Sequence, residues 1–135
     1  MKKIFQYIVI LIVAVLPIGL QAQTSQAYEM MVNGVKVIVQ PSGNEIIVVQ
    51  TIVKGGVENY PAAKAGIESL AFTALTECGT TQDDKNSFKN KLDKVSAQMY
   101  GSTNMDYGNF SMNCIKSDFE TVWPLYTTAL TTPAF

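Results

Sequence analysis

The sequence contains no histidine and no arginine, and only two of its 135 residues are cysteine. Without histidine, the chain lacks the side chain that most often acts as a general base near neutral pH and as a zinc ligand. All ten basic residues are lysine, and eleven acidic residues balance them. Because nucleic-acid binding usually requires clustered positive charge, this balance argues against a nucleic-acid partner.

The two cysteines, Cys78 and Cys114, permit at most one disulfide, and only in an oxidising compartment. The sequence does not show whether their Cα atoms come within bridging distance. Since a free cysteine behaves as a small hydrophobic residue, two semi-buried thiols are the favoured interpretation, and the disulfide remains the alternative.

The first 22 residues have the pattern of a signal peptide. Lys2 and Lys3 precede an uncharged run from Ile8 to Leu20, and Ala22 supplies a small residue at the cleavage position. The run is shorter than the ~18 apolar residues typical of a membrane-spanning helix, so we expect no stable membrane anchor. The sequence therefore predicts an exported protein, periplasmic or secreted, whose mature part spans residues 23–135.

The mature part begins with patterns typical of strands. The pair Asn33-Gly34 between two apolar runs predicts a hairpin of residues 28–32 and 35–40. A third strand is predicted over residues 45–53. It is apolar almost throughout, so we expect both of its faces to be covered.

Helical patterns follow. A helix is predicted over residues 65–80, with one apolar stripe made of Ile67, Leu70, Ala71, Ala74 and Leu75. A second helix is predicted over residues 85–99. Residues 110–114 alternate as in a half-buried strand, and a last helix opens near Ser117 and contains Pro124, where we expect a kink or an interruption. This order predicts an α+β fold, an antiparallel-rich sheet with helices packed on one face.

Several segments together resemble the insulinase/pitrilysin family of zinc metallopeptidases. The family's opening three strands are similar to the run YEMMVNGVKVIVQPSGNEIIVVQTIVKGG, and its K-x-G-[IL] … G-T helix is similar to KAGIESLAFTALTECGT. Its next strand and the end of its next helix resemble STNMDYGNFSMNCIKSDFE and TALTTPAF. The resemblance implies the N-terminal part of one domain with an insulinase- or mitochondrial-processing-peptidase-like fold, truncated relative to the family at Phe135.

Catalytic members of that family carry H-x-x-E-H on this helix, where the two histidines bind zinc and the glutamate acts as the general base. Counted forward from Gly66, the three positions are Ser69, Phe72 and Thr73; counted back from Gly79, they are Leu70, Thr73 and Ala74. Neither count gives a histidine or a glutamate, and the family's third ligand would lie beyond the last residue of this chain. The resemblance therefore implies a non-catalytic homologue that has lost the zinc of the family.

Two acidic residues on the same helix, Glu68 and Glu77, do not replace the missing ligands. Nine positions separate them, which is about 13 Å along a helix, so they cannot share one ion. We expect both to be solvated surface groups.

In the family, a substrate peptide adds as a strand to an exposed sheet edge. The resemblance places that edge at Tyr100, Gly101, Ser102, Thr103 and Asp106. Thr103 and Asp106 match the family pattern, whereas its asparagine is missing. Backbone pairing needs no particular side chain, so peptide binding without catalysis is one interpretation and an ordinary edge strand is the other.

Because active and inactive units often pair in this family, the resemblance implies an inactive partner of a catalytic subunit. Two alternatives stay open: a stand-alone periplasmic module that binds peptides or acts as a scaffold, and a truncated product without a function of its own. A neighbouring reading frame encoding H-x-x-E-H would favour the first hypothesis, and a frame continuing past Phe135 would favour the last.

Overall fold

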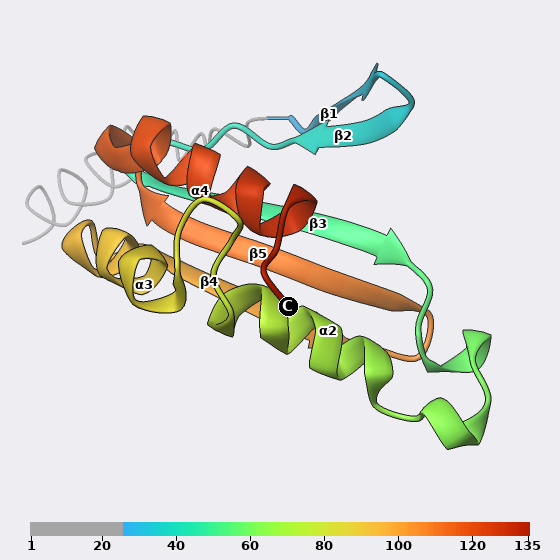
Figure 1. Cartoon of the computed structure of the whole chain (residues 1–135). Coiled ribbons are helices and arrows are strands. Elements are labelled where there is room, and N and C mark those ends of the chain that lie inside the picture. Colours follow the sequence, from blue (N-terminus) through green and yellow to red (C-terminus); the bar gives the residue numbers. More distant parts are fainter. Residues whose placement is uncertain (1–25) are drawn as a thin grey trace, which may run out of the picture. The chain divides into compact units, whose positions relative to one another are not determined.

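The computed structural model describes residues 26–135 (Figure 1). The chain divides after Gly43 into two compact units, which are described separately. The predicted signal peptide lies outside the described residues. Within them, no helix is both long enough and apolar enough to cross a bilayer.

The first unit is a two-stranded antiparallel hairpin of β1 (Tyr28–Val32) and β2 (Val35–Val39). The turn residues Asn33 and Gly34 have φ angles of 49° and 84°. These positive angles are what a two-residue hairpin turn requires, and the predicted hairpin is confirmed.

The second unit contains a three-stranded antiparallel sheet in the order β3-β5-β4 (Figure 1). Its strands are β3 (Ile46–Lys54), β4 (Gln98–Thr103) and β5 (Tyr107–Ile115). Its helices are α2 (Ile67–Glu77), α3 (Lys85–Lys94) and α4 (Phe119–Thr131). Short 3₁₀ turns lie at η1 (Val57–Asn59), η2 (Ala62–Lys64) and η3 (Lys116–Asp118). All three helices contribute to one core on one face of this sheet, as predicted.

The core of this unit forms where α4 lies over the centre of the sheet. Phe110 of β5 stacks on Tyr126 of α4 with ring centroids 5.0 Å apart. The Tyr126 hydroxyl donates to the Phe110 carbonyl oxygen at 2.7 Å, and Thr51 Oγ of β3 lies 2.7 Å from the same hydroxyl. Burial raises the pKa of Tyr126, so this hydroxyl stays protonated. One side chain thus joins α4 to both β3 and β5.

Three predictions about these elements are wrong in whole or in part. The outward face of β3 is exposed, because the helices cover only the other face; this face carries Ile46, Val48 and Ile52. The second helix ends at Lys94 instead of 99, since Ser96 takes a positive φ of 50° and the chain turns into β4. Helix α4 is not interrupted at Pro124, because its buried residues hold both halves against the core, and the other expected outcome, a kink, stays a prediction.

Candidate functional site

Helix α2 carries the five residues that the resemblance places at the zinc-motif positions, and they face different surroundings. Ser69, Leu70 and Thr73 are exposed, Ala74 is half-buried, and Phe72 is buried at 8% exposure. The positions four residues apart are exposed in the first count, Ser69 and Thr73, and exposed and half-buried in the second, Leu70 and Ala74; they carry hydroxyl or apolar groups. None of these side chains can act as a base or bind zinc.

The buried face of α2 differs from the predicted stripe. Ile67 and Leu70 are 53% and 70% exposed, and Ala71 is exposed as well, whereas Leu75 is buried as predicted and Phe72, outside the predicted stripe, is buried too. The prediction was wrong for Ile67, Leu70 and Ala71 because apolar residues surround most of this helix, so periodicity alone favoured a neighbouring face. The helix packs on the sheet with Leu75 from the predicted stripe and Phe72 from outside it.

Phe72 lies in a notch over two glycines of the sheet. A Cβ atom at Gly101 of β4 would lie 2.1 Å from the Phe72 carbonyl oxygen, and a Cβ at Gly108 of β5 would lie 2.1 Å from the Phe72 ring. Only glycine therefore allows α2 to approach β4 and β5 this closely. Sequence reasoning missed the notch, although a glycine inside a strand is a known signal of close approach.

Glu68, in the first turn of α2, is not the solvated group that was predicted. Its Oε1 accepts a hydrogen bond from the Gly56 backbone N–H at 3.2 Å, and its Oε2 is buried without a partner in the described part of the chain. A carboxylate in the first turn also interacts favourably with the helix dipole. Glu68 therefore ties the beginning of α2 to the glycine break that follows β3.

Glu77, at the other end of α2, is partly exposed as predicted, but it is paired. Its Oε2 lies 2.6 Å from Lys89 Nζ and 3.5 Å from Lys85 Nζ. The hydrogen bond from Lys89 lowers the pKa of this carboxyl group. The two acidic residues of α2 thus have separate local partners, and in residues 26–135 no group of three or more acidic or cysteine side chains could hold a metal ion.

The predicted peptide-binding segment is an edge strand. Within the described sheet, β4 pairs only with β5, so its other side is open. Asn104 N–H donates to the Tyr107 carbonyl oxygen at 2.8 Å. In an antiparallel pair, hydrogen-bonded and non-hydrogen-bonded residue pairs alternate, so this bond shows which residues of β4 bond to β5. The residues paired through hydrogen bonds to β5 are therefore Gln98, Tyr100 and Ser102. The backbone N–H groups that point toward the open edge are those of Met99, Gly101 and Thr103.

The five predicted edge residues therefore have different roles. Gly101 and Thr103 present backbone groups at the edge, whereas the backbone of Tyr100 and Ser102 pairs with β5 and their exposed side chains lie on the open face of the sheet. Asp106 lies outside β4, in the turn to β5, where its carbonyl oxygen accepts from Gly55 N–H at 3.1 Å. No charged side chain lies in β4 itself, so this edge can offer main-chain hydrogen bonds without an ionic preference.

The two cysteines are both free in the structure. Cys114 is buried on β5, and burial together with the negative charge of Asp118 raises the pKa of its thiol. Cys78 is exposed just after α2. The prediction of two semi-buried thiols is therefore correct for Cys114 and wrong for Cys78. Because its raised pKa keeps the Cys114 thiol protonated, Cys114 is a poor nucleophile.

The fold is similar to that of two solved structures. The first, described as a protease from Helicobacter pylori, gives a TM-score of 0.71 at 16% identity, over 82% of this chain and 27% of that chain. The second, described as a peptidase M16 inactive domain from Pseudomonas fluorescens, gives a TM-score of 0.71 at 17% identity over the same shares, 82% and 27%. No protein-family model and no curated protein matches the sequence.

This likeness confirms the insulinase-type (M16) fold that the sequence resemblance implied. At these identities it concerns the fold alone. The chain spans about a quarter of the length of each structure it resembles, since it covers 27% of each.

Proposed function

We propose that the protein is an exported, non-catalytic relative of the insulinase-type peptidases. In this proposal it binds extended peptides along the open edge of β4 and serves as the inactive partner of a catalytic subunit. The observation that carries the proposal is the uncharged edge of β4, with three backbone N–H groups directed away from β5. Strand addition to such an edge obtains its affinity from main-chain hydrogen bonds.

The lack of catalysis follows from the residue types on α2. The sequence has no histidine, and the outward positions Ser69, Leu70 and Thr73 cannot activate a water molecule. We therefore expect the purified protein to contain no stoichiometric zinc and to cleave no peptide. One zinc per chain that survives dialysis, with chelator-sensitive cleavage, would contradict this part of the proposal.

The partner role is supported by the outward surface of α2. Ile67 and Leu70 lie one turn apart and are more than half exposed, with the small Ala71 beside them. An apolar strip on the surface of a soluble protein often marks a contact with another protein. A structure of similar fold is itself described as an inactive domain.

Peptide binding can be tested by fluorescence anisotropy with a labelled peptide of about eight alternating threonine and valine residues, a common strand length. Thr103→Pro removes one of the N–H groups at the open edge and should weaken binding about tenfold, the value of one hydrogen bond. Thr103→Val keeps the N–H and the shape of the side chain, so it should bind like the natural protein.

Two outcomes would reject peptide binding at this edge: no measurable binding, or equal binding by the proline and valine variants. A proline at Ser102 is a poor test, because that N–H faces β5 and its loss would damage the sheet.

The partner role can be tested by mixing the protein with a relative that carries H-x-x-E-H, followed by sizing and an assay of peptide cleavage. Leu70→Lys should weaken the complex, because it places a charge in the apolar strip. The matched control is Thr131→Lys, the same change of charge at an exposed position of α4. If no complex forms while peptide binding persists, the protein acts as a stand-alone peptide-binding module.

Export is tested by the mass of the mature protein. We expect Gln23 at its N-terminus after removal of residues 1–22. A product that retains Met1 and stays with the membrane would contradict export.

A further inference from the structure

A groove of about 390 Å³ lies between α3 and α4, away from the edge of β4. Its apolar part consists of Val95, just after α3, together with Pro124 and Leu125 of α4. Asp83, Lys91 and Lys94 supply the charged groups of its rim. We call this feature the α3–α4 groove. Its volume lies at the small end of the range of about 300–1,000 Å³ for ligand sites in proteins.

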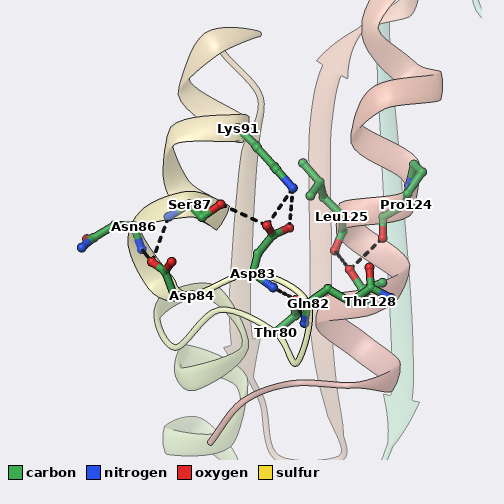
Figure 2. A network of polar contacts seen from close by, with 10 residues as sticks. All are labelled: Thr80, Gln82, Asp83, Asp84, Asn86, Ser87, Lys91, Pro124, Leu125 and Thr128. Atoms are coloured by element: carbon green, nitrogen blue, oxygen red, sulfur yellow. Dashed lines mark hydrogen bonds and ion pairs between the residues drawn. The ribbon is translucent and has the colours of Figure 1, made fainter.

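Asp83 has two side-chain partners, Lys91 in the groove and Ser87 beside it. Both of its carboxylate oxygens lie 2.7 Å from Lys91 Nζ, and Ser87 Oγ donates to Oδ1 at 3.0 Å (Figure 2). The turn from Thr80 to Asp83 is closed by a backbone hydrogen bond, in which Thr80 N–H donates to the Asp83 carbonyl oxygen at 2.8 Å. The Asp83–Lys91 ion pair has no net charge, so the groove does not attract a cation through Asp83.

Lys94 is different from Lys91. It lies one turn later on α3, lines the same groove, and makes no ion pair with any residue of the described chain. The groove therefore combines an apolar wall with one uncompensated positive charge. A single ammonium group suits one carboxylate, whereas a polyphosphate would require several cations or a cradle of backbone N–H groups.

From this combination we propose that the α3–α4 groove binds the carboxyl-terminal end of a peptide whose last residue is aliphatic. The aliphatic side chain packs against Val95, Pro124 and Leu125, and the terminal carboxylate pairs with the Lys94 ammonium group. The inference does not rest on the function proposed above, because it uses neither β4 nor the outward surface of α2.

The test is a titration of the purified protein, followed by NMR, with three small probes. N-acetyl-leucine carries both features and should bind with a Kd on the order of 1 mM, as its small size allows. N-acetyl-leucine amide lacks the negative charge and should bind about tenfold more weakly. N-acetyl-alanine lacks most of the apolar side chain and should also lose about tenfold or more.

The matched variants are Lys94→Met and Lys89→Met, which remove the same charge from the same helix. Lys94→Met should weaken N-acetyl-leucine about tenfold and leave the amide unchanged, whereas Lys89→Met should alter neither, because Lys89 pairs with Glu77 outside the groove. Added salt should weaken the acid more than the amide, since the contact is exposed.

Three results would overturn the proposal. The acid and the amide could bind equally, or Lys94→Met could leave the affinity for the acid unchanged. Alternatively, sizing could reveal a dimer that Lys94→Met dissociates, in which case the groove is occupied by a second copy of the chain.

Discussion

Strand β5 and helix α2 pack against each other, yet they distribute their side chains in opposite ways. Along β5, the buried residues Phe110, Met112 and Cys114 alternate with Asn109, Ser111 and Asn113, which are polar and half-buried. Along α2, apolar residues occupy both surfaces: Phe72 and Leu75 are buried, while Ile67 and Leu70 are exposed.

This difference shows that the outward side of β5 is more polar than the outward side of α2. Ser111 and Asn113 place polar side chains on the open side of the sheet, although the neighbouring strand β3 exposes Ile46, Val48 and Ile52 on that side. The outward surface of α2 has no such groups at Ile67 and Leu70, although it is exposed. Stability should therefore depend on the inner face of α2, and recognition on its outer face.

The largest effect should come from the inner face of α2. Phe72→Ala empties the notch over Gly101 and Gly108 and should lower the free energy of unfolding by about 3–5 kcal/mol. Leu70→Ala, on the outer face, should change it by about 0.5 kcal/mol or less. Urea unfolding can be followed with the fluorescence of Trp123, the only tryptophan. Equal losses in the two variants would contradict the comparison of the two faces.

The next effect concerns the floor of the notch. Gly108→Ala places a Cβ against the Phe72 ring and should cost about 1–3 kcal/mol of stability. In the Phe72→Ala background the same change should cost much less, because the ring is gone and only Glu68 Oε1, 3.0 Å from the new Cβ, remains close. Gly43→Ala is the control, since a Cβ there meets no atom within 4 Å. Additive losses in the double variant would contradict the contact.

A smaller effect is expected where α4 meets the sheet. Tyr126→Phe removes the hydroxyl that bonds Phe110 and Thr51, and it should cost about 1 kcal/mol. Tyr100→Phe changes an exposed hydroxyl on the open face and should have little effect, which thermal unfolding of the two variants will test. A neutral Tyr126→Phe would mean that the stacked ring alone holds α4 in place.

The smallest effect is a dependence on acid at the end of α2. The pKa of Glu77 is lowered from its ordinary value of 4.5 by Lys89, so its ion pair stabilises the fold above pH 4.5 and this contribution is lost as the pH falls. The group is 44% exposed, and solvent screening limits the contribution to about 0.5 kcal/mol or less. Glu77→Gln should remove this part of the acid dependence, whereas Glu120→Gln should retain it. The measurement is the free energy of unfolding as a function of pH for the natural protein, Glu77→Gln and Glu120→Gln.

Some features were predictable because their causes are local. The hairpin follows from Asn33-Gly34, since only a few residue types accept positive φ angles. The buried face of β5 follows from strict alternation, since a strand offers only two faces. The lack of zinc chemistry at α2 also rests on residue types alone, and it stays a prediction.

Other features depended on contacts between distant segments. A helix with apolar residues on several sides can turn any of them inward, and the choice of Phe72 for α2 depends on Gly101 and Gly108, which lie about 30 or more positions away. The early end of α3 depends on the pairing of β4 with β5, which recruits residues that a periodic pattern had assigned to the helix.

By itself, the sequence determined the α+β order of elements, the hairpin, the sorted faces of β5 and the residue types available for chemistry, because each depends on neighbours in the chain. Only the tertiary structure decided which face of α2 is buried, which backbone groups of β4 remain open and where Lys94 meets an apolar groove. These outcomes depend on how segments far apart in sequence fit together, and shape complementarity of that kind leaves no local pattern to read.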